Sequence, residues 1–169
     1  MPIKIAVIFL LVSFIHPVFS QSEKPFSSLG FDKLVMYDFN SHPDGGDIYI
    51  ANANGKLSTD ILKQIEMTEE ELKSFHAKLE NKKSYGETTE ACFDPHLGFV
   101  YYLKGTIVAH ITVDLACNRL HASIDIPAQK QGKVSVGADT YYTATGLSKS
   151  FKTFINDLLV KYQFSHQLN

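Results

Sequence analysis

The chain of 169 residues lacks several features that define whole classes of protein. It has no Trp, only two Cys and no Asn-x-Ser/Thr sequence. Its Lys and Arg residues are spread singly or in pairs and the net charge is −2, which argues against a surface for nucleic acid. No apolar run after residue 20 approaches the roughly 18–20 residues that a membrane-spanning helix needs. We therefore expect neither nucleic-acid binding nor a membrane span.

The first 20 residues have the pattern of a secretory signal peptide. Lys4 supplies a positive charge, residues 5–15 form a short apolar run, and Pro17 interrupts that run. Val18 and Ser20 then stand at positions −3 and −1 of a cleavage site. We expect cleavage after Ser20 and a secreted or periplasmic location. The absence of glycosylation sequences favours a bacterial protein.

The rest of the chain has the size and composition of one globular domain. The chain is 44% hydrophobic and 20% charged, which is close to the average for folded proteins. Residues 21–30 are polar and contain Pro25, so we interpret them as a flexible N-terminal arm. The remaining residues, 31–169, are predicted to form a single domain.

Two helices are predicted from caps and apolar periodicity. Thr68 and Glu71 form a capping box, which predicts a helix over residues 69–80. Ser148 is a good N-cap for a second helix over 148–162, which carries one wide apolar stripe. A stripe of that width predicts burial against a sheet.

Strand-forming segments separate the two helices. They are rich in β-branched and aromatic residues and are bounded by turn residues. The predicted strands are 33–39, 47–51, 97–103, 106–115 and 120–126, with residues 133–143 pairing back onto them. Because the helices are segregated from these hairpins, the sequence predicts an α+β fold. We expect an antiparallel sheet of about five strands with both helices on one face.

The two cysteines are predicted neighbours in this sheet. A two-residue turn at Lys104-Gly105 makes Leu103 face Thr106, and continuing that register places Cys92 opposite Cys117. Two opposed cysteines that face the core of an exported protein favour a disulfide. The same register assigns the remaining hairpin residues to faces. The cysteine face receives Val100, Ile107, Ala109, Ile111, Val113 and Leu115, and the other face receives Phe99, Tyr101, Val108, His110, Thr112 and Asp114.

Metal binding is the alternative interpretation of the cysteines. Residues 92–96 and 117–121 both have the spacing C-x-x-x-H, but in a hairpin the two histidines diverge to either side of the cysteines. A closer set arises if Pro95 folds the chain back. That set consists of Cys92, His96, Asp114 and Cys117, and it would suit a metal-binding or thiol-dependent enzyme.

The segments 92–102 and 108–119 resemble a group of uncharacterised secreted bacterial proteins. These carry a C-x-x-P-[RH]-H-type strand, a glycine turn and a second strand that ends in C-x-x-C. The resemblance covers residues 85–165 and, faintly, the part before them, and it implies no established activity. Asp114 stands where the first Cys of the C-x-x-C is expected, which argues further against metal. Residues 129–145 look like an insertion relative to that group.

The sequence gives no positive sign of catalysis. His110 and Cys117 are predicted on opposite faces of one strand, so they do not form a nucleophile–base pair, and His110 is interpreted as a sheet-face histidine. We expect an exported, non-catalytic domain that binds a partner or a cell-envelope component, without a cofactor or a resident metal.

Overall fold

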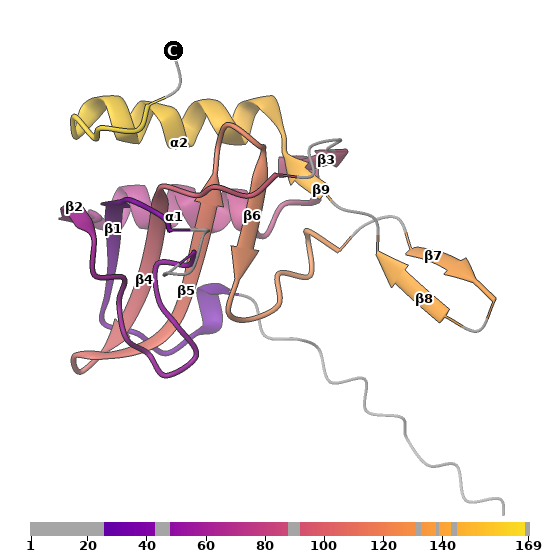
Figure 1. Ribbon diagram of the computed structural model, residues 1–169, viewed down its shortest axis with the longest axis horizontal. Helices are drawn as coiled ribbons and strands as arrows, with labels where there is room; N and C mark the ends of the chain where they lie inside the picture. The colour runs from indigo at the N-terminus through magenta and orange to yellow at the C-terminus, as the bar shows by residue number, and fades with distance from the viewer. Residues whose placement is uncertain are drawn as a thin grey trace, which may run out of the picture.

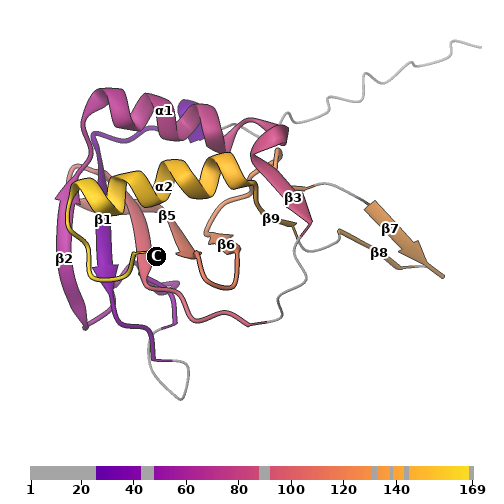
Figure 2. The same ribbon diagram turned by 90° about the horizontal axis from the view of Figure 1, so that it is seen from above.

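The computed structural model describes residues 26–42, 48–87, 92–130, 133–137, 139–142 and 145–167. It shows an α+β fold with a five-stranded antiparallel sheet of order β2-β1-β4-β5-β6 (Figure 1). Both helices lie on the same face of this sheet, as Figure 2 shows from above. The strands of the sheet are β1 (Lys33–Phe39), β2 (Ile61–Glu66), β4 (Leu97–Leu103), β5 (Thr106–Asp114) and β6 (Arg119–Ala122). The predicted fold class is therefore confirmed.

The two helices are those predicted from the sequence. Helix α1 spans Glu69–Leu79, and its capping box between Thr68 and Glu71 is present. Helix α2 spans Lys149–Lys161, with the Ser148 side chain accepting a hydrogen bond from the backbone N–H of Phe151. Both helix starts could be predicted because a cap is a local feature of sequence.

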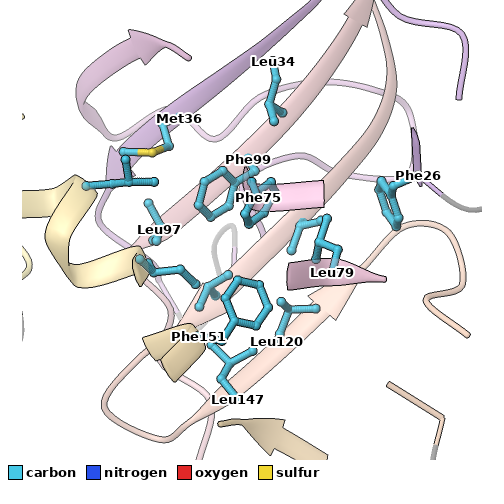
Figure 3. Close-up of a cluster of buried hydrophobic side chains, with 14 of the residues drawn as sticks. Phe26, Leu34, Met36, Phe75, Leu79, Leu97, Phe99, Leu120, Leu147 and Phe151 are labelled. Carbon is cyan, nitrogen blue, oxygen red and sulfur yellow. The ribbon is translucent and has the colours of Figure 1, made fainter. Parts of the chain in front are cut away.

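The helices and the sheet enclose the main core, which we call the helix-side core (Figure 3). The rings of Phe75 on α1 and Phe99 on β4 stack with centroids 4.2 Å apart, and Phe151 of α2 lies 6.0 Å from Phe75. Phe26, from a short 3-10 helix (Phe26–Ser28), is only 1% exposed and belongs to this core. The end of the predicted flexible arm is therefore part of the packed domain.

A β-bulge changes the predicted register of the β4–β5 hairpin. The turn at Lys104-Gly105 is as predicted, and Leu103 pairs with Thr106. The register then shifts by one residue at Val108, so that Val100 pairs with His110 instead of Phe99. The shift reverses the predicted faces of β4 and of the start of β5. Phe99 and Tyr101 point to the helix-side core, whereas Val100 and Ile107 lie on the other side.

Three other predictions about strands are corrected by the structure. Of the predicted strand 47–51, residue 47 lies outside the described residues, and residues 48–51 contribute only an isolated bridge, between Ala51 and Leu57. Strand β6 ends at Ala122 rather than at residue 126. Strands β7 (Lys133–Val136) and β8 (Asp139–Tyr142) pair with each other in a two-stranded sheet, and both views draw them apart from the main sheet.

A further small sheet ties the start of α2 to the end of α1. Strand β3 (Tyr85–Glu87) pairs with β9 (Thr145–Leu147). The backbone N–H of Ser148 also donates to the carbonyl of Ser84, at 2.8 Å. These bonds hold the two helix ends over the sheet.

Candidate functional site

The face of the sheet away from the helices is partly covered by residues 48–60. Ile50 is fully buried there, and its backbone N–H donates to the Thr112 hydroxyl at 3.2 Å. Gly98 allows this close approach, because a Cβ at that position would lie 2.3 Å from Cγ1 of Ile50. Ile50 packs with β1 and β4 side chains in a second apolar cluster, which we call the outer cluster. Its buried members are Val35, Tyr37, Phe39, Ile50, Val100 and Tyr102.

A pocket of about 620 Å³ lies where this covering segment ends and strands β5 and β6 remain open. We call it the β5–β6 pocket. Its walls come from the covering segment, from the bulged part of β5 and from β6 with the residues that follow it. The lining residues are Tyr49, Ala51, Asn52, Ala53, Gly55, Ile107, Val108, Ala109, His110, His121, Ser123 and Ile124. Cavities of this size suit small-molecule ligands.

His110 is the most deeply placed polar side chain of the pocket. It is 8% exposed, and its Nδ1 is the one buried side-chain nitrogen or oxygen in the described residues that has no hydrogen-bond partner. Its backbone is fixed, since the N–H donates to the Ser123 hydroxyl at 2.8 Å and the carbonyl accepts from Ser123 N–H at 2.9 Å. A buried polar atom without a partner costs about 1–3 kcal/mol, so a ligand that bonds to it recovers that cost.

A cluster of tilted aromatic rings lies beside the same pocket. The Tyr49 ring lies 4.4 Å from the His121 ring and 5.9 Å from the Phe93 ring, measured between centroids. The Arg119 guanidinium lies 5.7 Å from the centroid of Phe93. Tyr49 is thus held between a strand residue and a loop residue, although it is itself 38% exposed.

Both histidines of the pocket favour their neutral form. Burial lowers the pKa of His110, and the nearby His121 lowers it further. Burial also lowers the pKa of His121. His121 pairs with Thr112 across β5 and β6, so it is a diagonal neighbour of His110 on one face of the sheet. At neutral pH the pocket therefore offers uncharged imidazoles, each with one donor and one acceptor nitrogen.

The predicted cysteine pair is joined in the structure. Cys92 and Cys117 form a disulfide with their Cα atoms 5.7 Å apart. Neither cysteine belongs to a strand, because Cys92 precedes β4 in a loop and Cys117 lies in the turn between β5 and β6. Cys92 is exposed rather than core-facing, whereas Cys117 is buried. The pairing was predicted, but the continuous ladder used to predict it is wrong.

Asp114 aligns the two segments that the disulfide joins. It is 2% exposed, and its carboxylate accepts from the backbone N–H groups of Asp94, at 2.7 Å, and Cys117, at 2.8 Å. The sulfurs of Cys92 and Cys117 are bonded to each other, so neither is a thiolate that could bind metal in this state. Within the described residues, no group of three or more His, Cys, Asp or Glu is arranged to hold a metal ion.

His96 is the fourth residue of the predicted metal-binding set. It lines one pocket together with Asp114 and also contacts the C-terminal segment. Its ring stacks on His166 with centroids 3.9 Å apart, and its Nδ1 lies 3.2 Å from the carbonyl oxygen of Phe39. Asp38, which is 1% exposed, accepts from His166 Nδ1 at 2.6 Å and from the backbone N–H of Ser165. This cluster fastens the segment after α2 to the end of β1.

Sequence reasoning missed the pocket but not its histidine. His110 was recognised and interpreted as an ordinary sheet-face residue, whereas the structure leaves its Nδ1 buried without a partner. Tyr49 gave no signal, because its role depends on where residues 48–60 cross the sheet. The turn at Asn54-Gly55 was the one local sign that this segment reverses near the sheet.

No protein family, curated protein or solved structure was found to match the chain. The resemblance to secreted bacterial proteins therefore stays a prediction. Among the helices in the described ranges, none is long and apolar enough to cross a membrane.

Proposed function

We propose that this protein is an exported, non-catalytic binding domain and that the β5–β6 pocket is its binding site. The observation that carries the proposal is His110, whose ring lines a cavity of about 620 Å³ and whose buried Nδ1 has no hydrogen-bond partner. A ligand group that bonds to this nitrogen gains a hydrogen bond and removes a desolvation cost. The ligand is a small molecule, or a group presented by a partner or an envelope component.

Two features support export. The first 20 residues have the charge, apolar run and cleavage pattern of a signal peptide, and they lie outside the described residues. A disulfide at Cys92–Cys117 suits an oxidising compartment. Mass spectrometry of the native protein tests this part of the proposal. A chain that begins at Gln21 supports export, and a chain that keeps Met1 contradicts it.

Binding at the pocket is tested by amide chemical shifts of the ¹⁵N-labelled mature protein. A set of neutral, anionic and cationic fragments is added one at a time at about 1 mM. We expect the shifts caused by bound fragments to cluster at Tyr49, His110, His121 and Ser123. If every fragment leaves these four amides unchanged, the proposal is wrong.

A matched pair of variants separates the pocket from general surface binding. Ala53 is exposed and lines the pocket, so Ala53→Trp should fill its mouth without disturbing the core. Ala77 is exposed on α1, on the opposite face of the sheet, so Ala77→Trp adds the same ring elsewhere. Fragment binding should be lost in the first variant and kept in the second. Equal binding in both would overturn the pocket assignment.

A further inference from the structure

We propose that the ligand of the β5–β6 pocket is an uncharged planar aromatic ring that carries a hydrogen-bond donor, which it gives to His110. This inference rests on the proposed function, because it specifies what the same pocket binds. Three observations support it: the absence of charged side chains from the lining, the aromatic side wall and the unpaired nitrogen of His110.

The lining selects against charge. None of its residues is Asp, Glu, Lys or Arg, and most of them present carbon atoms to the cavity. A charged ligand would lose water without meeting an opposite charge, which is costly in an apolar site. The molecule carries charges elsewhere, so this neutrality is a property of the pocket and not of the whole chain.

The shape of the lining favours a flat ring. Ala51, Ala53 and Gly55 have small side chains or none, and they line the same cavity as the imidazole and phenol rings. The His121 and Tyr49 planes meet at 38°, and Tyr49 is partly exposed. Aromatic rings pack on such a surface in offset or edge-to-face geometry, at about 0.5–1.5 kcal/mol beyond the area buried. A cavity of about 620 Å³ accommodates a fused two-ring system.

The polar requirement comes from His110. In a neutral imidazole whose Nδ1 has no partner, the more favourable tautomer has no proton on this nitrogen, because no N–H donor is then left unpaired. The bare nitrogen is an acceptor, so its complement is an N–H or O–H group. Nδ1 is covered while other atoms of the ring line the pocket, so the proposed bond requires the imidazole to turn about the Cβ–Cγ bond until Nδ1 faces the ligand.

Four indole derivatives test the donor and the charge separately. Indole is planar, uncharged and has one N–H, and 1-methylindole lacks only that donor. Indole-3-acetamide and indole-3-acetate have nearly the same shape but differ in charge. Dissociation constants are measured on the mature protein by amide shift titration. We expect 1-methylindole to bind about fivefold to tenfold more weakly than indole, and the acetate at least about tenfold more weakly than the acetamide.

His110→Phe keeps a planar ring and removes both nitrogens. It should bind indole and 1-methylindole equally, whereas His42→Phe, at an exposed histidine outside the pocket lining, should keep the preference for indole. If His110 had a purely structural role, its replacement would weaken the binding of both ligands by the same factor. The comparison of the two indoles on the unmodified protein needs no variant, so a folding defect in His110→Phe does not remove the test.

The outcomes distinguish the two proposals. Equal binding of indole and 1-methylindole to the unmodified protein, or tighter binding of the acetate, overturns the ligand class and leaves the pocket as a binding site. If the fragment set and all four indoles leave the pocket amides unchanged, the proposed function itself fails. Shifts at the pocket amides with both expected preferences support the inference.

Discussion

At the scale of single residues, Gly98 controls how closely residues 48–60 approach the sheet. The position has no side chain, and Ile50 occupies the space that one would take. Ile50 in turn anchors the segment that carries Tyr49 and Ala51, two residues of the pocket wall. A glycine inside a strand usually weakens it, so its presence here is explained by this close packing.

Gly98→Ala should therefore disturb both stability and the pocket. The added Cβ would lie 2.3 Å from Cγ1 and 2.5 Å from Cβ of Ile50, too close for adjustment of a flexible side-chain end alone. We expect the free energy of unfolding to fall by about 1–3 kcal/mol, as for other overpacked sites. Urea denaturation measures it, and amide shifts report the change at Tyr49.

Gly30→Ala is the matched control, since nothing lies within 4 Å of a Cβ at that position. It should leave both the urea midpoint and the Tyr49 amide close to those of the unmodified protein. A Gly98→Ala variant that is as stable as Gly30→Ala, with unchanged shifts along residues 48–60, would show that this segment does not depend on Ile50.

The two cysteines and His110 show which features of single residues can be predicted from the sequence and which cannot. Cys92 and Cys117 could be paired from their number and compartment, which do not depend on register. The position of His110 beside an unfilled cavity could not be predicted from the sequence, because it depends on a one-residue bulge at Val108 and on a segment that crosses the sheet. Neither feature has a local sequence signature, since both arise from contacts between distant parts of the chain.

At the scale of elements, Glu71 joins the start of α1 to the end of α2. Its carboxylate accepts from Lys161 Nζ and from the Tyr162 hydroxyl, each at 2.7 Å, and from Thr68 in the capping box. Burial acts to raise the pKa of Glu71, but the hydrogen bonds from Lys161, Tyr162 and Thr68 outweigh it and lower the pKa from 4.5 to about 2. The charged form is therefore strongly favoured in the folded protein.

This shift predicts a specific loss of stability in acid. A carboxyl whose pKa is lower in the folded than in the unfolded state stabilises the fold above pH 4.5, and the contribution disappears as the pH falls from 4.5 to 2. The Glu71 side chain is 10% exposed, and a shift of this size corresponds to about 3 kcal/mol. Urea denaturation at pH 6, 4 and 2 measures the change.

Glu71→Gln keeps the size of the side chain and removes its titration. We expect this variant to be less stable than the unmodified protein at pH 6 and nearly equal to it at pH 2. Glu69→Gln, at an exposed residue of the same first turn, serves as the control and should keep the steep acid dependence. Parallel curves of stability against pH for the unmodified protein and Glu71→Gln would contradict the predicted contribution of Glu71.

The helices and the strands also differ in how well they could be predicted from the sequence. Both helices were predicted within one or two residues of their ends, because caps and a period of about 3.6 residues are local signals. The β7–β8 hairpin was recognised as strand-forming but assigned to the wrong partner. Alternating residues indicate that a strand exists, but its partner is decided by contacts far along the chain.

At the scale of the whole molecule, the disulfide connects the core framework to the pocket. Cys92 is followed by Phe93, whose ring lies against Tyr49, and Tyr49 lies against His121 of the pocket wall. Arg119 reinforces this arrangement through the Phe93 ring and through a hydrogen bond to the carbonyl oxygen of Cys92, at 3.4 Å. The loop that carries Cys92 thus has its position fixed covalently on one side and by aromatic packing on the other.

Reduction of Cys92–Cys117 should consequently affect stability and binding but not the sheet. The bond joins residues 25 apart, and closing a loop of that length contributes about 3 kcal/mol in the chain-entropy model. We expect a reductant to lower the guanidinium midpoint accordingly, with an unchanged far-ultraviolet circular dichroism spectrum. Because Phe93 then loses its fixed position beside Tyr49, indole binding should weaken severalfold.

The double variant Cys92→Ser/Cys117→Ser is the control. It should have the same guanidinium midpoint as the reduced protein, and a reductant should not change that midpoint. A midpoint that reductant leaves unchanged, after thiol titration has shown two free sulfurs, would mean that the bond constrains neither the fold nor the pocket.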